Sequence, residues 1–114
     1  MKGITFGIGM GKSGGGGGSD TSAYHPNVVE KSANYTAVNN DIVWVTTGAS
    51  NITITLPPAT ANAYITVTKV DSGSGKVIVD GDGAETINGS ATQEMTLQDE
   101  SFVMCSNGTE WRII

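Results

Sequence analysis

The chain has 114 residues, a formal net charge of −5, a hydrophobic content of 38% and one cysteine. This length allows one small domain with a tail, and the modest apolar content makes association with other chains a natural way to complete a core. The acidic balance argues against nucleic acid as a partner, the single cysteine excludes an internal disulfide, and no apolar run is long enough for a transmembrane helix.

The chain opens with ITFGIGMGKSGGGGGSD, whose centre resembles the end of a phosphate-binding loop. Such a loop reads G-x-x-x-x-G-K-[ST] between a strand and a helix, so that backbone N–H groups cradle phosphates. Counting back from Gly11, the first glycine of the motif would stand at position 6, which is Phe6. The five consecutive glycines that begin at Gly14 do not start a helix, since each costs about 1 kcal/mol relative to alanine. The stretch therefore does not predict a nucleotide site.

The same stretch has the alternation of a β-strand. Apolar residues alternate with small ones, which gives one apolar face and one nearly bare face, and the apolar positions are Ile4, Phe6, Ile8 and Met10. The glycine run that follows is typical of a flexible tether. We expect residues 1–13 to be an anchoring arm that binds another protein through these four side chains by adding a strand. The alternative is a disordered tail, with GGGGGS as a trace of cloning.

Residues 14–34 are interpreted as a glycine-rich linker followed by an extended connector. The only histidine, His25, lies here, and neither it nor Cys105 has the partners that a catalytic or metal site requires. From residue 35 onward, Thr, Val, Ile and Gly dominate, and turn residues interrupt short alternating runs. This pattern predicts an all-β knob domain over residues 35–114.

Seven strands are expected in the knob. The clearest is NITITL at 51–56, which alternates strictly and is ended by Pro57-Pro58 because proline cannot donate to a sheet ladder. Asn107-Gly108 predicts a hairpin between the last two strands. The large side chains expected in the core or in an interface are Trp44, Phe102 and Trp111. The expected strands cover residues 41–47, 51–56, 64–70, 76–80, 93–98, 101–105 and 110–114.

Two groups of acidic residues are candidates for a functional site, one for calcium binding and one for acid–base catalysis. The DGDG run at 80–83 resembles the start of a calcium loop, but the twelfth position, where an EF-hand has glutamate, is Ala91. A looser calcium site with Glu85 remains an alternative to a simple turn. Asp71 and Asp80 are a candidate acid–base pair, but nothing else in the sequence builds a pocket around them. Because no catalytic or metal-ligand constellation emerges, the sequence predicts a non-enzymatic protein without a cofactor or a metal.

Three stretches of the knob share the arrangement of a known module: DIVWVTTGASNITITLPPA (41–59), ITVTKVDSGSGKVIVDGDGAETING (65–89) and ESFVMCSNGTEWRII (100–114). They resemble a module of bacteriophage virion proteins, common in tail fibres and in small head or tail appendages. The module runs T-L-P-x-A, then I-T-V-K-K-x-D, then D-G-x-E-T-I-x-G, and ends in a hairpin S-D-G-x-W. Here the first proline is doubled, and Asn107 stands where aspartate is common.

The resemblance implies a structural module, often a homotrimer, with no catalytic residues. Three chains that share one core would also suit the modest apolar content. We therefore expect an all-β fold, a small antiparallel β-sandwich or a β-prism-like domain, that is trimeric and has an extended N-terminal arm.

The expected function is that of a capsid decoration protein, a cement or head-fibre protein of the virion that is assembled in the host cytoplasm. Its arm would bind the major capsid protein or a tail protein, and the lack of a long shaft favours this over a host-reading fibre. The alternative is a tail-associated protein that recognises a host surface glycan through Tyr24, Tyr35, Tyr64 or Trp111. A weaker alternative is an enzyme or calcium module on the DGDG turn. Neither nucleic acid nor a membrane is an expected partner.

Overall fold

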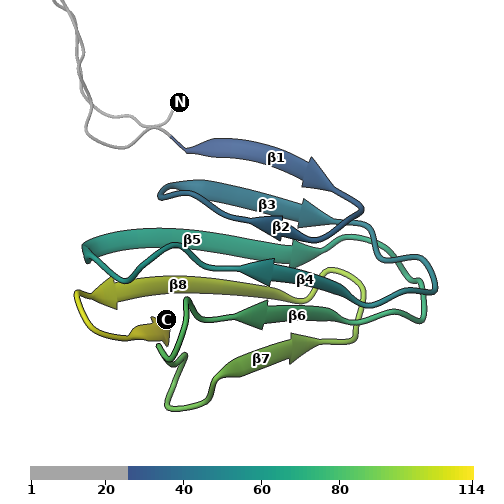
Figure 1. Ribbon diagram of the computed structural model, residues 1–114. Helices are drawn as coiled ribbons and strands as arrows, with labels where there is room; N and C mark the ends of the chain where they lie inside the picture. Colours follow the sequence, from purple (N-terminus) through teal and green to yellow (C-terminus); the bar gives the residue numbers. More distant parts are fainter. Residues whose placement is uncertain (1–25) are drawn as a thin grey trace, which may run out of the picture.

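The computed structural model describes residues 26–114. The expected arm with Ile4, Phe6, Ile8 and Met10, together with the linker as far as His25, lies outside the described residues. Residues 26–114 contain no helix and form nine strands in two sheets (Figure 1). The strands are β1 (Asn27–Lys31), β2 (Tyr35–Thr36), β3 (Asp41–Val45), β4 (Ile52–Thr55), β5 (Ala61–Lys69), β6 (Val77–Asp80), β7 (Thr92–Met95), β8 (Ser101–Asn107) and β9 (Trp111–Ile113).

The first six strands alternate between the two sheets. β1, β3 and β5 lie side by side and parallel in a five-stranded sheet, while β2, β4 and β6 lie parallel in a four-stranded sheet. The arrows of the first set all point one way in Figure 1, and those of the second set point the other way. Each pair of successive strands is therefore one turn of a flattened coil, and three such turns stack along the molecule.

The last three strands close one end of this coil. β7 runs antiparallel to β6, β8 runs antiparallel to β5, and β9 forms a hairpin with β8. The hairpin turn is the one predicted from Asn107-Gly108, and Gly108 takes a positive φ of 105° there, a backbone conformation that suits glycine. The final order of the five-stranded sheet is β1-β3-β5-β8-β9, and that of the four-stranded sheet is β2-β4-β6-β7.

The all-β class is confirmed, but the sheets are mixed rather than antiparallel, so the expected antiparallel sandwich is not confirmed. The physical reason lies in the connections. Strands joined by a short hairpin must run antiparallel. From β1 to β6, each loop instead crosses to the opposite sheet, and the next strand but one returns to lie parallel. The alternation of side chains within a strand is the same in both cases, so it does not report strand direction.

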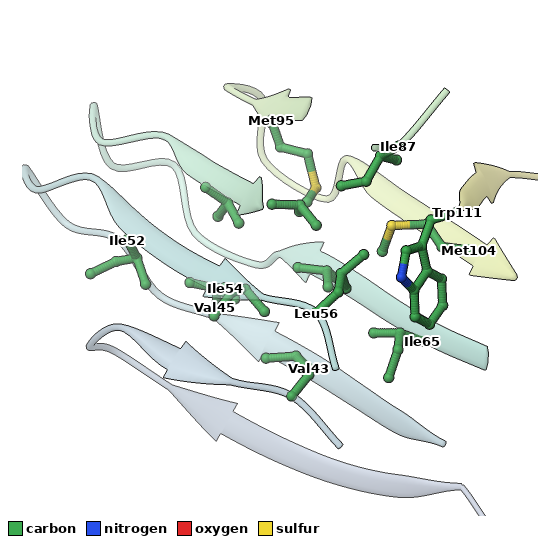
Figure 2. Close-up of a cluster of buried hydrophobic side chains, with 14 of the residues drawn as sticks. Val43, Val45, Ile52, Ile54, Leu56, Ile65, Ile87, Met95, Met104 and Trp111 are labelled. Atoms are coloured by element: carbon green, nitrogen blue, oxygen red, sulfur yellow. The ribbon is translucent and has the colours of Figure 1, made fainter. Parts of the chain in front are cut away.

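The core lies between the two sheets, where every second residue points inward (Figure 2). In β4, Ile52 and Ile54 are buried, while the intervening threonines are half-buried on the outer side. Burying one such side chain contributes about 1.5–3 kcal/mol. Trp111 of β9 is the largest buried side chain and lies at the closed end of the coil. Its indole N–H has no hydrogen-bond partner among the described residues.

The three large side chains expected in the core or in an interface differ in their burial. Trp111 is buried and Phe102 packs against the core. Trp44 is 42% exposed, because it follows the buried Val43 in β3 and so points to the outer face. An exposed tryptophan on a sheet face is available for contact with another molecule.

Candidate functional site

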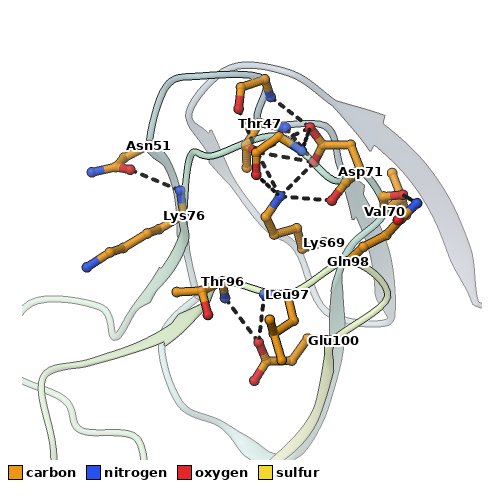
Figure 3. Close-up of polar contacts among 12 residues, drawn as sticks. Thr47, Asn51, Lys69, Val70, Asp71, Lys76, Thr96, Leu97, Gln98 and Glu100 are labelled. Atoms are coloured by element: carbon orange, nitrogen blue, oxygen red, sulfur yellow. Dashed lines mark hydrogen bonds and ion pairs between the residues drawn. The ribbon is translucent and has the colours of Figure 1, made fainter.

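The end of β5 carries a buried cation. Lys69 occupies an inward-facing position, and its side chain is 0% exposed. Its Nζ lies 3.0 Å from Thr47 Oγ1 and 2.9 Å from the carbonyl oxygen of Gly73. Asp71 supplies two more acceptors, its carbonyl oxygen at 2.9 Å and Oδ1 at 3.1 Å (Figure 3). The three N–H donors of the ammonium group are therefore surrounded by acceptors from the protein itself.

The carboxylate of Asp71 is held in turn by backbone donors. It accepts N–H groups of Thr47 at 3.1 Å, of Gly48 at 2.8 Å and of Gly73 at 3.2 Å. The Thr47 N–H, followed by the Gly48 N–H and the Lys69 ammonium, holds the pKa of Asp71 well below its usual range, although burial opposes this shift. Asp71 is consequently ionised at neutral pH.

These residues, here called the Lys69 cluster (Thr47, Gly48, Lys69, Asp71 and Gly73), join two turns of the coil. Thr47 and Gly48 follow β3 in the second turn, whereas Asp71 and Gly73 follow β5 in the third. A nucleophile or a general base needs a free lone pair or a proton-accepting group within reach of a substrate. Here the cation and the anion satisfy each other and the loop backbone, so the cluster is a structural cross-link.

A buried carboxylate lies at the start of β3. Asp41 is 0% exposed and accepts three hydrogen bonds, from Asn27 Nδ2 at 2.9 Å, Tyr35 Oη at 2.7 Å and the Val38 N–H at 2.9 Å. The hydrogen bond to Asp41, assisted by burial and by the negative charge of Asp41, raises the pKa of Tyr35 to about 12. This Asp41 cluster (Asn27, Tyr35, Val38 and Asp41) joins the first turn of the coil to the second.

The structure separates the two aspartates of the candidate acid–base pair. Asp71 lies on the loop before β6 and Asp80 is the last residue of β6, so the structure keeps the two at opposite ends of that strand. Glu85 accepts the N–H of Ala59 at 2.9 Å and so fastens one loop to another. Among residues 26–114, no three His, Cys, Asp or Glu side chains gather in a way that could hold a metal ion.

The outer faces of the two sheets differ in chemistry. On the five-stranded sheet, Val28 is 49% and Trp44 is 42% exposed. The strand register places further apolar side chains on this same face, namely Ile42, Tyr64, Val103 and Cys105. Polar side chains also lie on it, namely Glu30, Thr66, Thr68, Ser101 and Arg112. The outward positions of the four-stranded sheet are mostly threonine and acidic: Thr36, Thr53, Thr55, Ile78, Asp80, Thr92 and Glu94. The five-stranded sheet therefore offers the more adhesive of the two faces.

The five-stranded sheet also has one open edge, along β1. The Asn27 N–H donates to the Asn40 carbonyl at 3.0 Å, and the Lys31 carbonyl accepts the Thr46 N–H at 2.9 Å, so these residues direct their backbone groups toward β3. Successive residues of a strand direct these groups to alternate sides. Val28 and Glu30 therefore present their N–H and C=O groups away from β3, where no strand of the described chain lies.

The opposite edge of the same sheet, along β9, is covered. The Trp111 N–H donates to the Thr86 carbonyl at 2.9 Å, and the Trp111 carbonyl accepts the Asn88 N–H at 3.0 Å. The Ile113 N–H donates to Asn88 Oδ1 at 3.0 Å. The loop before β7 thus provides hydrogen-bond partners for the backbone groups that β9 would otherwise expose at this edge.

The expected binding residues are only partly within the described chain. The four arm residues and Tyr24 lie outside it. Of the aromatic residues considered for a host-binding face, Trp111 is buried in the core, which confirms the core prediction for it and removes it from the binding candidates. Tyr35 belongs to the Asp41 cluster, and Tyr64 is half-buried. Trp44 has the exposure that such a face requires. Four consecutive residues of DIVWV are apolar, so the sequence alone does not indicate which face of this strand is exposed.

No protein-family model matches this chain, and no curated protein sequence matches it. Residues 26–114 include no helix long and apolar enough to cross a membrane.

Proposed function

We propose that this chain is a non-enzymatic structural protein of a bacteriophage virion, a capsid decoration protein that is attached to the shell through residues 1–13. The observation that carries the proposal is where the polar and apolar groups lie in the fold. The buried polar clusters cross-link the coil, while exposed apolar side chains such as Val28 and Trp44 gather on one outer face. Such a molecule is suited to binding other proteins rather than to transforming a substrate.

Two further points support the proposal. The resemblance to virion modules extends over residues 35–114, and its motifs fall on β3, β4, β5, β6, β8 and β9. The adhesive outer face suits the homotrimer that the resemblance implies, because copies of a chain associate through apolar surface that is exposed in the single copy.

The test is binding of the full chain to purified phage heads and to separated tails, with the mass of the free protein measured in parallel. We expect a trimer that binds heads, and we expect the double variant Phe6→Asp, Ile8→Asp to lose head binding while keeping its thermal unfolding transition. The matched control is Ser13→Asp, which adds a charge outside the apolar face of the arm. Equal head binding by the wild type and the double variant would exclude attachment through the arm.

The alternative is a tail-associated protein that binds a host surface glycan. The observation in its favour is the exposed Trp44, because sugar rings stack on aromatic side chains that face solvent. Host cells are therefore included as a third binding target in the same experiment. Binding to cells or tails, but not to heads, would favour this alternative.

A further inference from the structure

We propose that the open edge of β1 is a second attachment element: it pairs with one extended strand of the virion protein to which the chain is anchored. The partner's strand would become the sixth strand of the sheet that now ends at β1. The proposal rests on the proposed function, since it supposes a protein partner in the virion, and it goes beyond that function by naming a surface and the shape of its ligand.

The backbone of β1 carries the first part of the case. Val28 and Glu30 direct two N–H and two C=O groups away from β3, in the plane of the sheet. A row of such groups is a template for another strand, because an extended backbone presents complementary donors and acceptors at the same spacing. Natural sheets usually blunt or cover such an edge. Within residues 26–114, this sheet has such a cover at β9 but none at β1.

The side chains of β1 indicate the chemistry of the ligand. Val28 is 49% exposed and lies beside the outward-facing Ile42 of β3, so an apolar residue of the partner would extend this strip. Glu30 is exposed on the same face, next to Trp44. Lys31 does not neutralise it from the edge, because its ammonium group lies over the ring of Tyr35, 4.2 Å from the ring centroid. The strand that fits is therefore apolar opposite Val28 and has a Lys or Arg opposite Glu30.

The position of β1 in the chain favours the anchoring partner as the occupant. β1 begins at Asn27, and only residues 14–26 separate it from the arm to which the proposed function assigns attachment. A chain of that length spans at most about 45 Å, so anchoring of the arm keeps this edge near the partner. A second copy of the chain fits less well. Pairing of β1 with the β1 of one other copy is a two-fold contact that closes at a dimer and uses both edges, which is incompatible with three equivalent copies.

The test uses the full chain and two variants of the edge. Val28→Pro removes one outward N–H without removing a hydrogen bond to β3, and proline is tolerated on an edge strand whose N–H faces solvent. Val28→Thr is the matched control, because it keeps the N–H. We expect Val28→Pro to weaken head binding at least tenfold, to leave the urea midpoint close to that of Val28→Thr, and to leave the mass of the free protein unchanged. Glu30→Lys, at an exposed position, is expected to weaken binding several-fold and does not depend on proline being accommodated.

Amide hydrogen exchange of peptides that span β1 supplies the second readout. In the free chain, we expect the amides of Val28 and Glu30 to exchange rapidly while that of Val29 is protected by β3, and we expect all three to be protected when the chain is bound to heads. Protection of Val28 and Glu30 in the free chain at every concentration would show that residues 1–25 of the same chain occupy the edge. Protection that grows with concentration would show a second copy there. Either result overturns the proposal.

Failure of the proposed function is distinguishable from failure of this inference. If the wild type binds neither heads nor tails, both are wrong. If the wild type binds heads but Val28→Pro and Glu30→Lys bind equally well, and the β1 amides stay unprotected, only the edge proposal is wrong and the arm remains the attachment.

Discussion

Hydrogen-bonded carboxylates lie at the two ends of β3, the buried Asp41 at its start and the partly buried Asp71 beyond its end, and they are stabilised in different ways. At the start of the strand, Asp41 is held by neutral donors, an amide, a phenol and a backbone N–H. Beyond its end, in the Lys69 cluster, Asp71 is held by backbone N–H groups and by a buried ammonium group. The comparison shows that a small coil can cross-link its turns either with hydrogen bonds alone or with an ion pair. The two solutions should differ in how much each loses when one partner is removed and in the pH at which each weakens.

The largest effect is expected from Lys69→Ala. The substitution leaves the mostly buried carboxylate of Asp71 without its cation and the loop carbonyl groups without a donor, which costs about 3–5 kcal/mol of unfolding free energy when a buried pair is broken in this way. The control is Lys76→Ala, which removes an ion pair to Glu94 whose side chains are both 46% exposed, and it should cost less than about 1 kcal/mol. Urea unfolding followed by tryptophan fluorescence measures both. Similar losses in the two variants would contradict the cross-linking role of Lys69.

A smaller effect is expected on the acid dependence of the unfolding free energy, through Asp71. The folded state lowers the pKa of Asp71, so the unfolded state binds a proton that the folded state does not, and stability falls as the pH drops below the unfolded carboxyl pKa of about 4. Asp71→Asn should remove this part of the acid dependence, so that its unfolding free energy changes less between pH 5 and pH 2.5 than that of the wild type. Asp99→Asn, at an exposed position, is the control. An acid profile of Asp71→Asn that parallels the control would rule out the folded-state shift at Asp71.

Neither the Asp41 cluster nor the Lys69 cluster was predicted from the sequence, although the strand pattern contains part of the signal. In DIVWV, Asp41 precedes Val43 and Val45 on the buried face, and in YITVTKV, Lys69 continues the series of inward residues. A charge in an inward position of an alternating strand predicts a buried polar contact, because an unpaired charge there is too costly. The partners, Tyr35 and Thr47, come from other turns of the coil, so no local pattern identifies them.

The same limit applies to the strand pairing. The seven expected strands correspond to β3–β9 to within a few residues, because alternation and turn residues are local properties. The parallel pairing of β1 with β3 is not local, and β1 itself lies in the segment interpreted as an extended connector. The sequence NVVEK is too short and too polar to be distinguished from such a connector until its pairing with β3 is seen.

The smallest effect is expected in the Asp41 cluster, whose hydrogen-bond donors are uncharged, and it concerns stability at high pH. Tyr35→Phe removes the hydroxyl that donates to Asp41 but keeps an aromatic ring beneath Lys31, so at pH 8 we expect a loss of about 1.5–3 kcal/mol, the range for a hydrogen bond to a charged group. The folded state raises the pKa of Tyr35 from 10.0 to about 12, which means that this stabilisation is fully present below pH 10 and is lost as the pH rises toward 12. The difference between the wild type and Tyr35→Phe should therefore shrink from pH 8 to pH 11.5, while other alkaline titrations cancel in the comparison. If the difference in unfolding free energy between the wild type and Tyr35→Phe stays constant over this range, the hydrogen bond to Asp41 does not raise the pKa of Tyr35. The Asp41 cluster would then differ from the ion-paired Lys69 cluster in burial alone.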